Sequence, residues 1–290
     1  PIHQGIMERG SKTTSDSYLL WPARIGPFTL VMGRHYKNMD TSSLPFSYLI
    51  ESNDQSILVP GVNLRSVGTI RDAQKWPKRD RRKDPEKIDQ VNFNLLSPYT
   101  IRKMFEGRDL LRKIKSVSGS VSASYAYNNM IIKGPSLDKG IELYQTGINK
   151  FLGNSLIKRL EKIQFRTDSD LRKRLEPDKS HGNGEWVDLA GLIAPQRVVD
   201  RLLDEIELGK TSTLQQIEEE FRAMHRSYYD WEWIWACDRI EEEAGKPVKS
   251  FTGADVIAFV EKWKKSVTEL DSMLYDDARK EFTLSSMTGF

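Results

Sequence analysis

The residues best suited to bind a ligand are the cationic side chains between Val59 and Arg82. They are Arg65, Arg71, Lys75, Lys78 and Arg79, and they surround Trp76. Arginine presents a planar fork that matches two phosphate oxygens, lysine adds a point charge, and a tryptophan face can stack on a base or a sugar. We therefore expect these residues to hold the phosphate of an anionic small molecule, a sugar phosphate or a nucleotide sugar, with Trp76 stacking on it.

Two other interpretations of this stretch stay open. Six of the nine residues from Lys75 to Lys83 are cationic and one is anionic, a composition that is also typical of a solvated linker. Arg65 and Arg71 lie in an otherwise apolar stretch, where an unpaired guanidinium would be costly. Each of them needs an anionic partner, which is either a ligand or a neighbouring carboxylate such as Asp72 or Asp80.

Arg34 and His35 are the candidate catalytic residues. They follow a predicted strand, and a histidine at a strand end can act as a general base while a neighbouring arginine contacts an oxyanion. We expect both to line the same cleft as the cationic residues. A purely structural histidine is the competing interpretation, because no serine or cysteine spacing accompanies His35.

Motifs of the common nucleotide-binding and metal-binding folds are absent from the sequence. There is no G-x-x-x-x-G-K phosphate loop, no G-x-G-x-x-G after a strand and no nucleophile elbow. Four histidines and one cysteine are scattered without the spacing of zinc ligands. The sequence therefore assigns neither a metal site nor a cofactor.

Composition places the chain among water-soluble globular proteins. Its 290 residues are 38% hydrophobic and 29% charged, with one cysteine. An apolar run of membrane-spanning length and a signal peptide are both absent, so we expect a cytoplasmic protein that does not enter the membrane. The first residue is Pro1 rather than Met, as expected of a piece of a longer chain.

Charge is divided unevenly along the chain. The first 115 residues hold 20 Lys and Arg against 12 Asp and Glu, whereas the remainder holds 24 against 29. The front of the chain therefore attracts anions. Nucleic acid is nevertheless disfavoured as the partner, because the whole chain carries only +3 and no nucleic-acid-binding motif accompanies the basic stretch.

The elements that must position these residues change in kind along the chain. Residues 1–95 are rich in Gly and Pro punctuation and contain four short apolar or β-branched runs, at 18–21, 28–32, 46–50 and 56–59. We expect strands and loops there, and no helix, arranged as a meander, a coil of a β-solenoid or an irregular cap. A hairpin is predicted through residues 51–55.

Helical periodicity begins after residue 96. Ser97 and Pro98 predict a helix start, apolar spacing predicts a second helix over about 136–163, and Pro195 to Gly209 predicts a third. A mobile surface loop is expected from Arg166 to Glu185. Spacings of three and four then predict one long helix over 212–245 and, after a capping box at Thr252, another that pairs with it as an antiparallel hairpin.

These patterns predict an α+β protein with two parts. The first, residues 1–95, is a β and loop segment that carries the basic stretch, and the second, residues 96–290, is α-helical.

The segments PFSYLIE, at residues 45–51, and VPGVNLRSVGTIRDAQKWPKRDRR, at residues 59–82, resemble an uncharacterised bacterial family, a domain of unknown function. The resemblance implies a left-handed β-helix of hexapeptide repeats, as in acyltransferases and sugar-nucleotide pyrophosphorylases, followed by a helical C-terminal region. Residues 1–35 would then be its last coils, with Ile25 and Gly26 as a remnant of the repeat. Several successive hexapeptides are not visible in the sequence, so most of the β-helix is expected to be missing, and no catalytic residue carries over.

Three functions follow as expectations. The first is a sugar-nucleotide or acyl transferase-like protein that holds an anionic small molecule through the arginine-rich segment. The second is a non-catalytic scaffold or protein-interaction module that docks a partner on the helical hairpin, and the third is nucleic-acid binding. Assembly into a homo-oligomer is compatible with all three.

Overall fold

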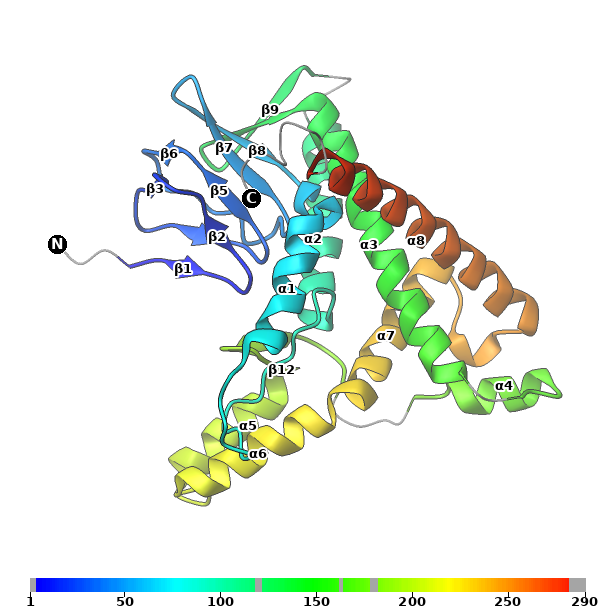
Figure 1. Ribbon diagram of the computed structural model, residues 1–290. Helices are drawn as coiled ribbons and strands as arrows, with labels where there is room; N and C mark the ends of the chain where they lie inside the picture. The colour runs from blue at the N-terminus through cyan, green and yellow to red at the C-terminus, as the bar shows by residue number, and fades with distance from the viewer. Residues whose placement is uncertain (1–3, 118–121, 162–163, 178–181, 282–290) are drawn as a thin grey trace. The chain divides into compact units, whose positions relative to one another are not determined.

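The computed structural model describes residues 4–117, 122–161, 164–177 and 182–281 of the chain (Figure 1). It confirms the predicted α+β class, with short strands first and a mainly helical region after them. The described residues form two compact units. One draws on residues up to 78, on 100–148 and on those from 267 onward, and the other comprises 79–99 and 149–266. The boundary predicted near residue 95 stays a prediction.

Six short strands open the first unit at a regular spacing. They are β1 Ile6–Met7, β2 Lys12–Thr13, β3 Tyr18–Leu19, β4 Arg24–Ile25, β5 Leu30–Met32 and β6 Arg34–His35. The first five begin six residues apart. Each of the first three pairs in parallel with the strand three places later, β1 with β4, β2 with β5 and β3 with β6. The chain therefore winds past three short parallel ladders and returns to each after 16 or 18 residues.

The winding ends in the predicted hairpin. β7 Tyr48–Ser52 continues the parallel ladder beside β5, and β8 Gln55–Val59 returns antiparallel to it. Asn53 and Asp54 form the turn with positive φ angles of 53° and 60°, as a tight two-residue hairpin requires. Each of the four predicted strand runs overlaps a strand. A second hairpin, β9 Ser124–Tyr127 and β10 Met130–Lys133, was not predicted, and β10 extends the same sheet in parallel beside β8.

A helix occupies the basic stretch, where none was expected. After a single turn of 3-10 helix, η1 Val62–Arg65, helix α1 runs over Val67–Arg79. The side chain of Asn63 fixes its start, because it donates to the carbonyl of Phe28 at 2.6 Å and accepts from the hydroxyl of Thr69 at 2.7 Å. The expectation of a helix-free segment over 1–95 was therefore wrong, since local side-chain contacts that are not visible as a periodic pattern start this helix.

The core of the first unit lies between the strands and two helices, α2 Pro98–Val117 and the first half of α3 Gly134–Leu160. Its fully buried residues include Ile25, Val31, Leu49, Leu58, Ile101, Met104 and Tyr144. The Tyr144 hydroxyl donates to the carbonyl of Pro45 at 2.8 Å. A buried ion pair, 3.1 Å between Lys103 Nζ on α2 and Glu8 Oε2 after β1, links α2 to the strands.

The second unit contains most of the remaining helices and one hairpin. These elements are α4 Asp168–Leu175, β11 Trp186–Leu189, β12 Leu192–Pro195, α5 Gln196–Glu207, α6 Leu214–Arg226, α7 Tyr228–Ala244 and the start of α8 Gly253–Glu281. A short 3-10 helix, η2 Val248–Ser250, connects α7 to α8. Apolar residues of β12, α5 and α6 form one cluster, which includes Ala194, Leu202 and Met224.

Two predictions for this unit need correction. The helix expected over 212–245 is broken at Ser227 into α6 and α7, so Phe221 and Trp231 pack on the β12 and α5 cluster. Helix α6 begins with a capping box formed by Thr213 and Gln216. The expected loop over 166–185 contains α4, which buries Leu171 and Leu175, while residues 178–181 lie outside the described ranges.

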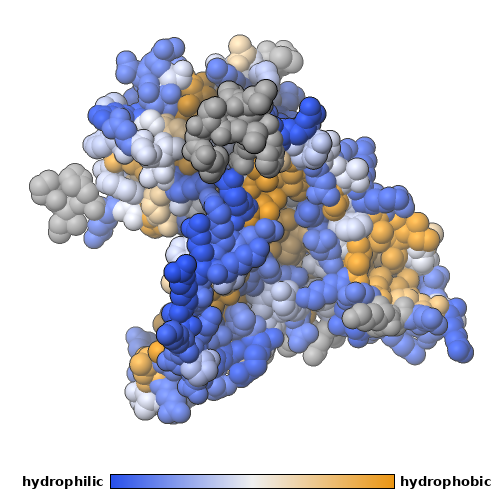
Figure 2. Space-filling view, viewed as in Figure 1, coloured by the Kyte–Doolittle hydropathy of each residue, from blue (hydrophilic) through white to orange (hydrophobic). Residues whose placement is uncertain are grey.

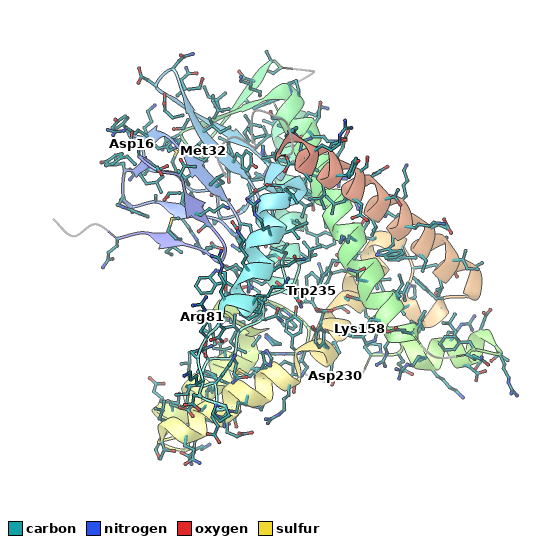
Figure 3. All side chains as sticks on the ribbon, viewed as in Figure 1. Asp16, Met32, Arg81, Lys158, Asp230 and Trp235 are labelled. Atoms are coloured by element: carbon teal, nitrogen blue, oxygen red, sulfur yellow. The ribbon has the colours of Figure 1, made fainter. Side chains whose placement is uncertain are left out.

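Helices α7 and α8 both pack on the second half of α3. Trp235 of α7 lies edge-on to Phe151 at 6.0 Å between ring centres, and Trp263 of α8 covers Gly153, where a Cβ would come within 2.3 Å of its ring. Trp263 also donates to the side chain of Asn154 at 2.8 Å. Figure 3 labels Trp235 on α7 and Lys158 on α3. Trp235 and Trp263 thus belong to the packing around the second half of α3.

Candidate functional site

The helix α1 presents its cations on an exposed surface. Only Thr69 of this helix is buried, and the side chain of Trp76 is 73% exposed. Figure 2 shows a strongly hydrophilic band where α1 lies in Figure 1. The start of the helix is anchored, because the Val67 N–H donates to Asp277 Oδ2 at 3.0 Å, in addition to the contacts of Asn63. The predicted ligand residues on α1 therefore sit on a fixed but convex element.

Part of the positive charge on α1 is balanced by a carboxylate. Lys12 Nζ lies 2.6 Å from Asp72 Oδ2. The pKa of Asp72 is lowered, first by that hydrogen bond and then by the nearby charges of Lys75 and Arg71. Asp72 was one of the two carboxylates expected as a partner of Arg65 or Arg71, and it forms its ion pair with Lys12.

Three of the predicted ligand residues carry charge without such compensation. Arg65, Lys78 and Arg79 are exposed, and no ion pair joins them to a carboxylate within the residues that the structure describes. Lys78 and Arg79 follow Trp76 directly, at the end of α1. This group of residues, Trp76, Lys78 and Arg79, is the part of the predicted site that is open to an anionic ligand, and we call it the α1 basic end.

The charges after α1 are arranged differently. Arg82 bonds both Asp80 and Asp89, and Lys87 Nζ lies 2.7 Å from Asp80 Oδ2. These contacts hold the pKa of the Asp80 carboxyl well below its usual range, chiefly through the hydrogen bonds from Arg82 and Lys87. Of the four cations at positions 81, 82, 83 and 87, Arg82 and Lys87 are therefore paired with carboxylates of the same segment.

Arg34 and His35 point to opposite faces of β6. Arg34 is exposed and bonds Asp16, which raises the pKa of its guanidinium. His35 is fully buried, its Nδ1 lies 2.8 Å from Ser56 Oγ on β8, and burial lowers its pKa. His35 Nε2 has no hydrogen-bond partner in the part of the chain that is described. Alternation along a strand separates neighbouring side chains in this way.

Ser56 is the partner that could not be found from sequence. It lies 21 positions after His35, and the pairing of β7 with β8 sets it opposite Glu51. The charge of Glu51 partly opposes the lowering of the His35 pKa. A neutral imidazole bonded to a hydroxyl is chemically able to accept a proton, but the catalytic roles of Arg34 and His35 stay predictions.

A cleft of about 930 Å³ lies elsewhere in the first unit. It is lined by residues from four separate segments: Gln4, Gly5, Ile6, Pro22, Ala23, Arg24, Asn38, Met39, Asp40, Asn128 and Asn129. None of the eight predicted site residues is among them. The sequence analysis did not identify this cleft. The Asn128-Asn129 dipeptide is typical of a turn, and its φ angles are 42° and 63°, but a turn pair does not indicate which segments it faces.

The described residues contain no cluster of three or more His, Cys, Asp or Glu side chains able to hold a metal ion. Among those same residues, no helix is both long and apolar enough to cross a lipid bilayer.

Comparisons with known proteins give similarity without an activity. Residues 1–115 match the family model described as a domain of unknown function (DUF4954), and residues 167–290 match a second one (DUF6819). An uncharacterized protein of Treponema pallidum (strain Nichols) is 22% identical over 249 residues, which cover 77% of this chain and 34% of the Treponema protein. The chain thus spans about a third of the length of this curated relative. No solved structure gives a significant match. The expected resemblance holds at this level: two stretches of the chain are similar to two domains of unknown function.

Proposed function

We propose that this chain holds the phosphate group of a sugar phosphate or nucleotide sugar at the α1 basic end, as the ligand-binding part of a transferase-like protein. The observation that carries the proposal is the exposed trio Trp76, Lys78 and Arg79, whose two cations have no carboxylate within ion-pair distance in the described ranges. An arginine fork and a lysine charge beside an exposed indole match a phosphate attached to a sugar or a base.

The anchoring of α1 supports the proposal. Because Asn63 and Asp277 fix the helix start, the cations are held on a defined element, which lowers the entropy that a ligand must remove on binding. Arg65 is exposed beside this start. Arg71 and Lys75 would add a longer-range attraction, reduced by Asp72.

We also infer that residues 4–52 are coils of the hexapeptide-repeat β-helix implied by the resemblance. In support, the first five strands begin six residues apart, and each ladder is parallel with a return of 16 or 18 residues. Gly26 fits a tight coil, since a Cβ there would lie 2.4 Å from the carbonyl oxygen of Thr41. A left-handed β-helix is a frequent scaffold of acyl and sugar-nucleotide transferases, and this is the link to a transferase reaction.

A thermal-shift titration tests the binding proposal. UDP-glucose and glucose 1-phosphate should raise the melting temperature, because a ligand present at about 100 times its Kd adds about 2.7 kcal/mol to the free energy of unfolding. Lys78→Glu should abolish the shift, because it reverses the charge beside Trp76. Lys113→Glu is the matched control, since Lys113 is an exposed lysine of another helix, α2, without an ion pair among the described residues. Absence of any shift in the unmodified chain contradicts the proposal.

A non-catalytic interaction module is the second candidate, and a different observation favours it. Around the connection from α5 to α6, Leu203, Leu208 and Leu214 are 57%, 69% and 69% exposed. Figure 2 shows hydrophobic surface where this connection lies in Figure 1. Exposed apolar side chains that cluster in this way are typical of protein-binding surfaces. If no phosphate-bearing ligand binds, this candidate takes first place.

A further inference from the structure

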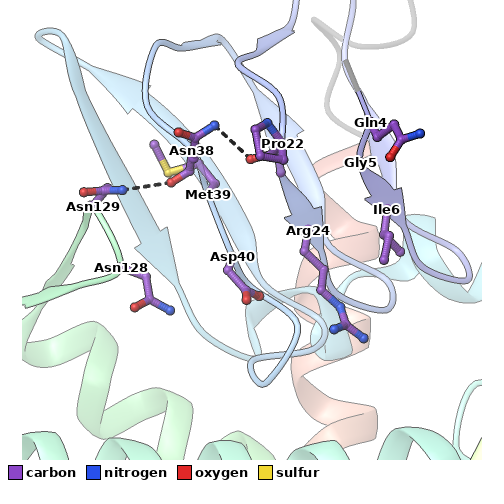
Figure 4. Close-up of a pocket in the computed structure, with 11 residues that line it drawn as sticks. Gln4, Gly5, Ile6, Pro22, Arg24, Asn38, Met39, Asp40, Asn128 and Asn129 are labelled. Carbon is purple, nitrogen blue, oxygen red and sulfur yellow. Dashed lines mark hydrogen bonds between the residues drawn. The ribbon is translucent and has the colours of Figure 1, made fainter. Parts of the chain in front are cut away.

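The cleft of the first unit is built on a rung of the parallel ladders. Ile6 pairs with Arg24, and Arg24 pairs with Asp40 in a parallel bridge. Residues in register on neighbouring strands lie about 4.8 Å apart and point to the same face. Figure 4 shows the side chains of Ile6, Arg24 and Asp40 side by side along this face, with Asn128 beyond Asp40. An apolar, a cationic and an anionic side chain are thus set in one row.

Three polar side chains that line the cleft are each held by a hydrogen bond that uses only some of their polar atoms. Asn38 donates to the carbonyl of Pro22 at 2.9 Å, and Asn129 donates to the backbone carbonyl of Asn38 at 3.0 Å (dashed in Figure 4). Arg24 Nε donates to Glu8 Oε1 at 3.2 Å. The amide oxygens of Asn38 and Asn129 and the terminal N–H groups of Arg24 are not used by these bonds. Such fixed side chains lose little conformational freedom when a ligand binds.

Two further groups face the same space. The amide of Asn128 has no hydrogen bond within the described residues, and its backbone φ of 42° at the tip of the β9–β10 hairpin holds it at the rim of the cleft. Asp40 uses Oδ1 to accept from the backbone N–H and the hydroxyl of Ser42, at 2.9 and 2.6 Å. Its second oxygen, Oδ2, is not used by these bonds.

The combination of groups defines a class of ligand. Amides both donate and accept, a carboxylate accepts, and a guanidinium donates, which matches hydroxyl groups that do both. Ile6 and Pro22, which are both exposed, supply apolar surface for the C–H face of a sugar ring. One cation and one anion in the lining leave no excess charge to select a phosphate, and about 930 Å³ lies within the range of small-molecule sites.

We propose that this cleft binds an uncharged polyhydroxylated ligand, a mono- or disaccharide, through Arg24, Asp40 and the amides of Asn38, Asn128 and Asn129. The site is separate from the α1 basic end and does not depend on the proposed function. A saccharide hydroxyl would donate to Asp40 Oδ2 while accepting from Arg24, and the asparagine amides would bond its neighbours.

Saturation-transfer-difference NMR on the full chain, with glucose, N-acetylglucosamine, maltose and cellobiose as probes, tests this proposal. We expect at least one of them to receive saturation, and a titration to give its Kd. Asn128→Gly removes one amide while keeping a residue that accepts a positive φ, and it should weaken binding about tenfold. Asp40→Asn should also weaken it, because the acceptor for a hydroxyl becomes neutral.

The matched control is Asn53→Gly, the same change at the same kind of turn position, φ 53°, in the exposed β7–β8 hairpin outside the cleft. It should leave the Kd unchanged. Binding that is equally weakened by both glycine variants, or no saturation of any of the four sugars, overturns the proposal. Lys78→Glu separates the two sites, since it should leave binding of the uncharged sugar intact even where it abolishes binding of glucose 1-phosphate.

Discussion

Two glutamates with equal burial show how differently the two units treat a buried acid. Glu8 in the first unit and Glu232 in the second are both 8% exposed. Glu8 has two cationic partners, Lys103 at 3.1 Å and Arg24 at 3.2 Å. The contact of Glu232 is the hydroxyl of Ser155 at 3.4 Å, and burial raises its pKa, against smaller opposing effects of Tyr228, Lys158 and Ser155.

The difference teaches that burial alone does not set the state of a carboxyl group. A buried charge is tolerated where a hydrogen-bonded counter-ion accompanies it, and otherwise the neutral form is favoured. The first unit therefore contains a buried ion pair, and removing one partner should lower the free energy of unfolding strongly. The second unit contains a buried acid, whose contribution to the free energy of unfolding depends on pH.

The largest expected effect comes from breaking the ion pair. Lys103→Met should lower the free energy of unfolding by about 3–5 kcal/mol, because it leaves Glu8 charged in a buried place and removes the bond to the Ser42 carbonyl. Chemical denaturation followed by circular dichroism measures this change.

The double variant Glu8→Gln with Lys103→Met is the control for that experiment. It removes both charges, so it should recover much of the lost stability. A cost for Lys103→Met of less than about 1 kcal/mol would mean that Arg24 alone neutralises Glu8, and the proposed contrast between the units would then be weaker.

Glu232→Gln should have a smaller effect of the opposite sign. The folded-state pKa of Glu232 is raised, so the stability contributed by its neutral form is fully present below the unfolded pKa of 4.5 and is lost as the pH rises through the folded pKa. Glutamine mimics the neutral acid and can keep the contact with Ser155. The variant should match the unmodified chain at pH below 4.5 and become more stable than it as the pH rises.

Denaturation curves of both proteins at a series of pH values test this prediction. A gap in stability that stays constant across the series would show that folding does not raise the pKa of Glu232, contrary to the comparison with Glu8.

The smallest effect is expected at His35, a buried base rather than a buried acid. Burial lowers its pKa, so the folded chain resists protonation where the unfolded chain accepts it. Stability from the neutral ring is present above the unfolded pKa of 6.5 and is lost as the pH falls through the folded pKa. A backbone hydrogen bond with Met32 and then the charge of Glu51 oppose this lowering of the pKa.

The variant His35→Gln has no group that changes its protonation at this position. Its deficit in stability relative to the unmodified chain should therefore shrink between pH 8 and pH 5.5, as measured by urea denaturation. An unchanged deficit would show that folding does not shift the pKa of His35.

The elements that could be predicted from sequence are those with a periodic or capped pattern. Helix α2 starts at Pro98 as predicted, α8 carries the reciprocal bonds between Thr252 and Asp255, and Gly245 ends α7 in the left-handed conformation. Propensity and spacing are local quantities, so they identify such elements well.

Features that depend on long-range contacts could not be predicted. Helix α1 rests on Asn63 and Asp277, the pairing of His35 with Ser56 spans 21 residues, and the cleft joins four segments from residue 4 to residue 129. The role of the basic residues as ligand contacts stays a prediction. Their distribution into compensated and uncompensated groups depends on which carboxylates the fold brings near, which the order of residues along the chain does not reveal.

The register of the ladders has a consequence for changes in chain length. The corner from Val31 to Arg34 is two residues shorter than the corner from Thr13 to Tyr18 that lies one coil earlier. The corner from Asp40 to Tyr48 is two residues longer than the corner from Arg24 to Leu30. The two residues missing at the first corner are thus regained at the later one, so that β7 pairs with β5 in register. Insertions and deletions should accordingly be accepted here in compensating pairs, which restore the register of the ladders.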